Sequence, residues 1–529
     1  MNKKASTQSA FFSPRAIIAL VSFIAAVFVV LLSEANSKNL LADHMRQPIK
    51  PLSRPPAGAQ EAWVARYDGP ATNDDEATAV AIDGSGNIYV TGFSFDPTTD
   101  YDYATIKYNS AGQQQWIARY DGPENYTDQA TAITVDASGN VYVTGGSSSN
   151  SGSLDYTTIK YNSAGQQQWV ARYDGFGDDD VATAIAVDGS GNVYVTGYSH
   201  GSGFNYDYVT IKYNSIGQQQ WVARYDGPGN DDDKAIAIAV DASGSVYITG
   251  RSYDPASDYD YATIRYNSAG QQQWVARYNG PANSDDEARA MAIDGAGNIY
   301  VTGYSGGSAS NDYATIKYDS AGQQQWVGRY DGPGHSDDTA NAISIDGSGF
   351  VYVTGYSTGS AGSYDYATIK YDASGEQQWA ARYDGPTNSE DLATAITVDG
   401  FGSVYVTGTT DADPSFWSGG NYTTIKYNSA GRQQWIEHYG GPGSYTDWPT
   451  AIVLDASDDV IVTGYSYGTD FDYATIKYVQ GATPTPTPTS TPTASPTATP
   501  TVSPTATPSA TPRVIPRPRP TPHPRPTPP

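Results

Sequence analysis

The chain has 529 residues, 43 tyrosines, no cysteine and a formal net charge of −26 at pH 7. Without cysteine it contains no disulfide framework, no thiolate zinc site and no cysteine nucleophile. Residues 61–480 include 54 acidic and 19 basic residues, and so acidic a surface repels nucleic-acid phosphates and anionic lipid head groups. We therefore expect no nucleic-acid partner, and cations or cationic polymers are the electrostatically favoured partners.

The first 37 residues have the pattern of an export signal. Lys3, Lys4 and Arg15 precede the apolar run 16–32, and small polar residues follow it. A run of this length is long for a cleaved signal peptide and just sufficient for a membrane span. It predicts either a signal peptide or an N-terminal transmembrane signal-anchor, with the rest of the chain extracellular or at the cell surface. The proline-containing residues 38–60 are predicted to form a linker.

A repeated unit of 52 to 56 residues occupies residues 61–480. In the fourth unit, strand-like runs lie at 220–225, 235–241, 245–250 and 259–266, separated by turn residues such as Asp-Ala-Ser-Gly. No run has the length or periodicity of a helix, so the fold is predicted to be all-β. One tryptophan marks each of the eight units: Trp63, Trp116, Trp169, Trp221, Trp274, Trp326, Trp379 and Trp435.

Side-chain size within the unit favours a propeller over a β-solenoid. The alanine-rich run 235–241 suits an innermost strand near the axis, whereas the bulky run 220–225 suits an outermost strand. The last unit lacks its outer strand, and the strand 62–67 ahead of the first unit is spare. We therefore predict a closed, monomeric β-propeller of eight four-stranded antiparallel blades, in which the N-terminal strand closes the last blade.

The C-terminal residues 481–529 have a different composition from the repeats. Thr-Pro repeats are followed by Arg-Pro repeats, and such a segment cannot pack a hydrophobic core. It predicts a disordered, extended stalk that is suited to crossing a cell wall.

The end of each repeat's second run carries the resemblance to a known family. The motif [Val/Ile]-Asp-x-x-Gly-[Asn/Ser]-[Val/Ile]-Tyr-[Val/Ile]-Thr-Gly, present as VDASGSVYITG at 240–250, resembles the bacterial beta-propeller repeat, SBBP, of exported proteins. The resemblance covers about 61–480 and implies a propeller on a secreted or surface protein, with no established general activity. A fainter similarity joins YNSAGQQQW to the tryptophan-docking repeats of eight-bladed quinoprotein dehydrogenases.

Acidic residues gather in the loop before each predicted inner strand. Clustered carboxylates are ligands for calcium, and the best candidates are Asp178 and Asp180 in unit three and Asp231 and Asp233 in unit four. The alternative is structural, with a carboxylate that accepts backbone N–H bonds and fixes the loop. Calcium is the one cofactor that this pattern suggests. One of these aspartates recurs in every unit: Asp75, Asp128, Asp180, Asp233, Asp286, Asp338, Asp391 and Asp447.

Two further sets of residues, each recurring at one position of the repeat and here called a column, are interpreted as structural. An aspartate directly before a tyrosine of the third strand, as at Asp102, becomes Asn421 in one unit, and asparagine replaces a hydrogen-bond acceptor but not a general base. An arginine of the outer strand, as at Arg119, is interpreted as protection against edge-to-edge aggregation. Unit eight adds Trp417 and Trp448, which either stack on a sugar ring or pack near the closing seam.

No catalytic constellation emerges from residues specific to one unit. The histidines occupy unrelated repeat positions, and the sequence contains no recognisable Ser/His/Asp arrangement, zinc cluster or phosphate-binding loop. The hypothesis is an exported, cell-surface or wall-associated propeller that binds an extracellular protein or glycan without catalysis. The alternative is a propeller enzyme that acts on polysaccharide, or a quinone- and calcium-dependent dehydrogenase.

Overall fold

The computed structural model describes residues 58–148, 152–201, 205–307, 310–411, 420–443 and 445–481. The predicted export signal, most of the linker, the stalk beyond residue 481 and Trp417 lie outside these residues, so their roles stay predictions. Among the described residues, no helix has both the length and the apolar character needed to cross a bilayer.

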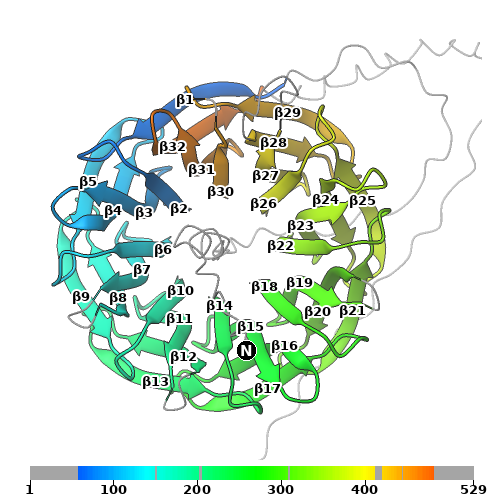
Figure 1. Cartoon of the computed structure of the whole chain (residues 1–529), viewed down its shortest axis with the longest axis horizontal. Helices are drawn as coiled ribbons and strands as arrows, with labels where there is room; N and C mark the ends of the chain where they lie inside the picture. The colour runs from blue at the N-terminus through cyan, green and yellow to red at the C-terminus, as the bar shows by residue number, and fades with distance from the viewer. Residues whose placement is uncertain are drawn as a thin grey trace, which may run out of the picture. The chain divides into compact units, whose positions relative to one another are not determined.

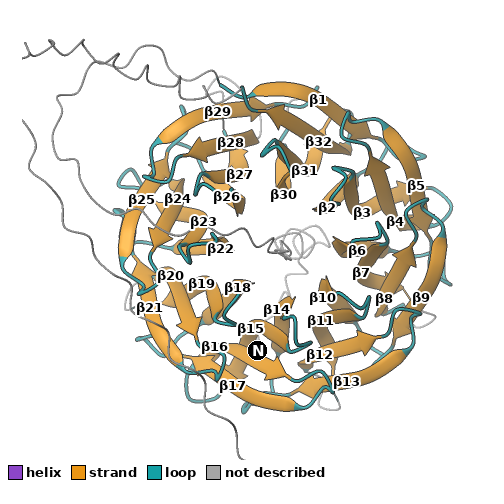
Figure 2. Cartoon of the chain, turned by 180° about the vertical axis from the view of Figure 1, so that it is seen from behind, coloured by secondary structure: helices purple, strands orange, loops and turns teal. Residues whose placement is uncertain are grey.

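The described residues form eight blades arranged in a ring (Figure 1). Each blade is a four-stranded antiparallel sheet, and strands, loops and turns account for every described segment (Figure 2). The prediction of an all-β, eight-bladed propeller is therefore confirmed.

The innermost strand of each blade is the alanine-rich one, as predicted from side-chain size. These strands are β2 (Asp75–Ile82), β6 (Asp128–Val135), β10 (Asp180–Val187), β14 (Asp233–Val240), β18 (Asp286–Ile293), β22 (Asp338–Ile345), β26 (Asp391–Val398) and β30 (Trp448–Leu454). The second strands are almost fully buried and apolar: β3 (Ile88–Asp96), β7 (Val141–Ser148), β11 (Val193–His200), β15 (Val246–Asp254), β19 (Ile299–Gly306), β23 (Val351–Thr358), β27 (Val404–Thr410) and β31 (Val460–Tyr467).

The third strands lie between these and the rim. They are β4 (Asp100–Tyr108), β8 (Leu154–Tyr161), β12 (Tyr206–Tyr213), β16 (Asp258–Tyr266), β20 (Asn311–Tyr318), β24 (Tyr364–Tyr371), β28 (Asn421–Tyr427) and β32 (Phe471–Val479). The outermost strands carry the tryptophans: β1 (Gln60–Tyr67), β5 (Gln114–Tyr120), β9 (Gln167–Tyr173), β13 (Gln219–Tyr225), β17 (Gln272–Tyr278), β21 (Gln324–Tyr330), β25 (Gln377–Tyr383) and β29 (Gln433–Tyr439).

The ring closes through its N-terminal strand. β1 pairs antiparallel with β32, from Gln60 opposite Val479 to Tyr67 opposite Tyr473, and completes the sheet β1-β32-β31-β30 (Figure 1). The hydroxyl of Thr450 in that blade also donates to the carbonyl of Ala77 in the first blade, at 3.0 Å. The predicted closure is confirmed, and it leaves neither end of the ring with an open edge.

Three repeated side-chain bonds join neighbouring blades. At the rim, the indole N–H of Trp116 donates to the carbonyl of Ser163 at 3.1 Å, and in the middle the buried hydroxyl of Tyr103 donates to the carbonyl of Thr157 at 3.3 Å. Near the axis, Thr78 donates to the carbonyl of Ala130 at 2.9 Å. These bonds satisfy polar groups that the packing of blade on blade would otherwise bury without partners.

Each inner strand contains a β-bulge that aims this axial side chain at the next blade. In β22 the register against β23 shifts between Ala340 and Ala342, so Asn341 is the extra residue. Its side-chain amide donates to the carbonyl of Ala393 in the next blade at 2.8 Å. A bulge redirects a side chain in this way because the local ladder is interrupted and the strand bends.

Candidate functional site

Long loops gather on one side of the ring, which we call the loop face. In an antiparallel blade, the connection from outer strand to next inner strand and the connection from second to third strand end on the same side. In the fourth blade these are residues 226–232 and 255–257. The opposite side, the turn face, carries the tight Asp-x-x-Gly hairpins. Variable loops on a rigid scaffold are the usual place for binding residues.

The aspartate that recurs in every blade fixes the loop ahead of the inner strand. Asp233, fully buried, accepts the N–H of Gly227 at 2.5 Å and the N–H of Tyr253 at 3.1 Å. The glycine bond recurs in all eight blades at 2.5–2.7 Å. The structural interpretation of this column is confirmed.

The arginines of the outer strands point into the blade junctions, so their interpretation as protection against edge-to-edge aggregation is wrong. Arg119 donates to the hydroxyls of Ser94 at 2.6 Å and Tyr67 at 2.9 Å, and to Oδ2 of Asp102 at 2.9 Å. The guanidinium thus links three strands from two blades, because its planar fork presents several donors at once. The second aspartate column is structural, as predicted, since Asp102 is the acceptor of this arginine.

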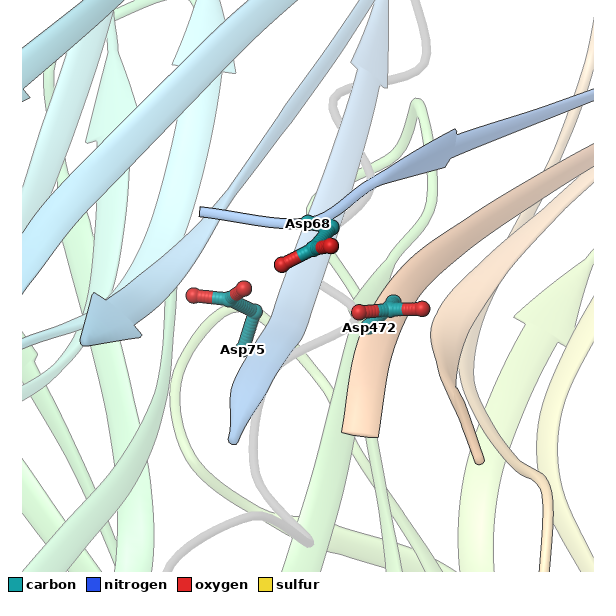
Figure 3. A group of neighbouring side chains, drawn as sticks. All are labelled: Asp68, Asp75 and Asp472. Atoms are coloured by element: carbon teal, nitrogen blue, oxygen red, sulfur yellow. The ribbon is translucent and has the colours of Figure 1, made fainter. Parts of the chain in front are cut away.

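Three carboxylates meet at each of several junctions. Figure 3 shows Asp68 after β1, Asp75 at the start of β2 and Asp472 near the start of β32. One oxygen of each carboxylate lies within 4.8 Å of the others. Equivalent groups combine Asp180 with Asp155 and Asp174, and Asp233 with Asp207 and Asp226. The predicted partners Asp178 and Asp231 are not in these groups. Both are exposed, and Asp178 lies 3.3 Å from Nδ1 of His200.

These groups do not fit a calcium ion well. In the first junction Asp472 accepts the guanidinium of Arg66 at 2.5 Å, while Asp75 accepts the N–H of Gly69 at 2.5 Å and that of Phe95 at 3.1 Å. Calcium takes six to eight oxygen ligands, and three of the six carboxylate oxygens of this group are already acceptors. The arginine supplies positive charge where a metal would supply it. A calcium role for Asp178, Asp180, Asp231 and Asp233 stays a prediction.

Burial controls the charge state of the recurring aspartates. It raises the pKa of Asp75, Asp128 and Asp233 to about 6 and that of Asp391 to about 7, against the hydrogen bonds that lower each pKa. An unfolded aspartate titrates near pH 3.9. Because the folded pKa is the higher one, the stability from these groups is fully present below about pH 4 and is lost as the pH rises through 6 to 7.

We therefore expect the full chain to melt at a higher temperature at pH 5 than at pH 8. Each unit of pKa shift corresponds to about 1.4 kcal/mol at most. Asp391→Asn, which cannot ionise, should reduce the difference between the two pH values. Glu390→Gln, an exposed neighbour that loses the same charge, should leave the difference unchanged. An equal difference in the wild-type protein and in Asp391→Asn would contradict this assignment.

The tryptophan candidates of the eighth blade are only partly described. Trp448 is half-buried at the start of β30, directly opposite Tyr465 in β31. Trp417 lies outside the described residues. The loop face of this blade also carries Tyr445, whose ring lies 4.4 Å from that of Tyr467 and is 59% exposed.

A cluster of basic side chains distinguishes the fourth and fifth blades from the others. Fifteen of the 19 basic residues within 61–480 occupy two repeated positions, the outer-strand arginine and the third-strand lysine or arginine. Among the remaining four, Lys234, Arg251 and Arg289, which we call the basic cluster, lie on β14, β15 and β18. The fourth, Arg432, is exposed in a turn far along the ring.

Glu287 joins the two arginines of the basic cluster. Its Oε2 accepts Nη1 of Arg251 at 2.9 Å and the hydroxyl of Tyr304 at 3.3 Å, and its Oε1 lies 3.6 Å from Nε of Arg289. Nη1 of Arg289 also donates to Oδ1 of Asn341 in the sixth blade at 3.1 Å. The cluster therefore lies on the fourth and fifth blades, and its contacts reach Asn341 in the sixth.

The basic cluster was not predicted from the sequence, because its residues belong neither to a position that recurs in every repeat nor to a known motif. The signal was nevertheless present. Subtracting the basic residues that recur in most units leaves four basic side chains within 61–480, and three of them are Lys234, Arg251 and Arg289. Their proximity came only from the structure, because they are separated by up to 55 residues along the chain.

Comparisons with known proteins support the propeller architecture. Residues 115–152, 168–205, 273–308 and 325–360 match the beta-propeller repeat SBBP, which confirms the resemblance inferred from the motif. No curated protein sequence matches the chain.

Several solved structures are similar to the ring at low sequence identity. Sqt1 of Chaetomium thermophilum, solved bound to the N-terminus of ribosomal protein L10, is 10% identical with a TM-score of 0.49, over 80% of this chain and 100% of that one. The β-propeller domain of the Trilobed protease from Pyrococcus furiosus is 9% identical with a TM-score of 0.39, over 68% and 97%. The polysaccharide lyase Uly1 is 10% identical with a TM-score of 0.39, over 78% and 91%. None of these similarities is high enough to transfer a function.

Proposed function

We propose that this protein is an exported, cell-surface or wall-associated β-propeller that binds an extracellular protein or glycan and performs no catalysis. The basic, apolar and small-residue pattern of residues 1–37 supports export, and the Pro-rich tail supports a role as a stalk. The SBBP repeats and the closed ring supply the rigid scaffold.

Repeated side chains and blade-specific side chains have different roles in the ring, and this difference is the main support for a binding function. The repeated Asp, Arg and Trp residues and the tyrosines equivalent to Tyr103 are engaged in bonds that hold loops and blades together. Of the exposed blade-specific aromatic side chains, Tyr126, Phe176 and Tyr445 lie on the loop face and are 58%, 63% and 59% exposed, whereas the turn face exposes Phe401. Exposed aromatic rings and the basic cluster on one face are typical of a recognition surface.

The geometry gives the enzyme alternative little support. Among the described residues, the three histidines lie in different blades and each has a local partner. His200 faces Asp178, His335 contacts Asp331 at 2.8 Å, and the ring nitrogen of His438 is 2.8 Å from the hydroxyl of Thr423. A general acid and base for one substrate must both lie within hydrogen-bond reach of it, and these three do not converge.

An array of extracellular glycans and surface proteins, probed with the full chain in EDTA and then in calcium, tests the proposal. Saturable binding to an array component without turnover is the expected result. Binding that requires calcium would direct attention to the acidic loops. Bound-quinone absorbance in the purified protein, or cleavage of an arrayed polysaccharide, would overturn the non-catalytic assignment, and a complete absence of ligands would overturn the binding role.

A further inference from the structure

Two like charges face each other at the start of the fourth blade. Lys234 on β14 and Arg251 on β15 are directly opposite in register, an arrangement that destabilises a sheet. In the other seven blades the same positions never hold two cations. Their pairs are Glu76–Phe93, Gln129–Gly146, Val181–Tyr198, Glu287–Tyr304, Thr339–Tyr356, Leu392–Thr409 and Trp448–Tyr465.

The third member of the basic cluster replaces a structural residue. Arg289 occupies the bulge of β18, where the register shifts between Ala288 and Ala290. In five blades a threonine at this position donates to the carbonyl of the next inner strand, and Asn341 does the same in the sixth blade. Arg289 instead points its guanidinium at Asn341 and Glu287. Two departures from the stabilising pattern at one place are characteristic of a functional site.

Aromatic rings hold these cations in defined positions. Nζ of Lys234 lies 4.3 Å from the ring centre of Tyr206, and the guanidinium of Arg251 lies 4.8 Å from that of Tyr259. The guanidinium of Arg289 lies 5.3 Å from the ring centre of Tyr304. Such contacts, together with the carboxylates of the cluster, reduce the entropy that a ligand would otherwise have to remove from these long side chains.

The basic cluster is much less acidic than the ring around it. Asp232 lies 3.3 Å from Nζ of Lys234, and Glu287 forms ion pairs with both Arg251 and Arg289. Asp285 also lies near Arg251, so three cations meet three carboxylates and the local charge is balanced, in a domain with 54 acidic and 19 basic residues. At physiological ionic strength charges are screened beyond roughly 8 Å, so these nearby groups dominate the attraction of a small ligand.

We propose that the basic cluster binds the carboxylate of an acidic sugar, as one subsite of the binding function proposed above. Guanidinium groups match carboxylates in geometry and form their strongest hydrogen bonds with them. A sugar hydroxyl is both donor and acceptor, and the cluster offers both partners: cationic donors beside the carboxylates of Asp232 and Glu287 and the hydroxyl of Tyr304. An acidic peptide has few hydroxyl groups for those carboxylates, so the mixed set favours a saccharide.

Binding of a short galacturonic acid oligosaccharide to the full chain, measured by calorimetry, tests this site. Its fully methyl-esterified form is the matched neutral ligand. The variant Lys234→Gln/Arg251→Tyr/Arg289→Thr places at each position a residue that another blade already uses there, as in Gln129, Tyr198 and Thr183. We expect the wild-type protein to bind the acid in preference to the ester, and the variant to lose about tenfold or more in affinity.

Two controls separate recognition from folding and from net charge. The triple variant should stay folded, because it restores the threonine bond and removes the opposed cations, and Glu287, which loses both arginine partners, keeps the hydroxyl of Tyr304; its melting temperature checks this. Arg432→Gln removes a cation from a turn where other units carry glutamine, as at Gln113, and should leave binding unchanged.

Three outcomes would overturn the subsite. They are equal affinity for the acid and its ester, equal affinity of the wild-type protein and the triple variant, and tighter binding of a glutamate-rich peptide than of the oligosaccharide. If any of these occurs while the array still yields another ligand, the proposed binding role survives and only the subsite fails. If the array also yields nothing, both proposals fail.

Discussion

Gly355→Ala is expected to destabilise the propeller by more than about 3 kcal/mol, or to prevent the sixth blade from folding. A Cβ at this position would lie 2.0 Å from the carbonyl oxygen of Thr339 and 2.9 Å from the Cα of Ala340. Both atoms belong to the backbone of the adjacent inner strand. Neither can move aside without breaking the pairing of β22 with β23.

The β-bulge explains why glycine is required here. The extra residue in β22 pushes its backbone toward β23, and the residue opposite must have no side chain. The same approach, at 1.9–2.1 Å from a carbonyl oxygen, occurs at Gly92, Gly145, Gly197, Gly250, Gly303, Gly355, Gly408 and Gly464.

Thermal and urea unfolding of Gly355→Ala measure this effect, with Gly347→Ala as the matched control in the same blade. A Cβ at Gly347 would have no atom within 4 Å, and its φ lies outside the left-handed region. The control should change the free energy of unfolding by less than about 1 kcal/mol. Similar stability of the two variants would contradict the packing described here.

Deletion of residues 58–67 is expected to convert the protein, which we expect to be a monomer, into aggregating species. The deletion removes β1 and leaves the backbone of β32 unpaired along one edge, and exposed edge strands pair with other chains. It also removes Arg66, which donates to Tyr439, Ser466 and Asp472 across the seam. Light scattering coupled to size-exclusion chromatography gives the readout.

A deletion of the same length at residues 47–56, which retains β1, is the control and should leave the protein monomeric. A synthetic peptide of residues 58–67, added in excess during refolding of the deleted chain, should restore the monomer because it can complete the last blade. A deleted chain that stays monomeric and equally stable without the peptide would show that the ring does not depend on this closure.

The architecture could be predicted from the sequence because it depends on local and repeated features. The spacing of the tryptophans sets the number of blades, the alanine-rich runs identify the inner strands, and the spare strand at 62–67 predicts the closure. Each of these follows from side-chain size and strand order within one unit. The structural role of the recurring aspartates was also predictable, because a residue present in every blade is expected to fix a feature that all blades share, here the loop before the inner strand.

The sequence by itself therefore determined the class of fold, the number of blades and the order of strands within each blade. Only the tertiary structure decided which carboxylates share a junction, where the outer-strand arginines point, and that Lys234, Arg251 and Arg289 converge across two neighbouring blades. Those contacts depend on strand register, on the bulge in every inner strand and on the packing of one blade against the next. In nearly identical repeats, these pairings between neighbours leave no local pattern in the sequence, because the same residue types recur in every unit.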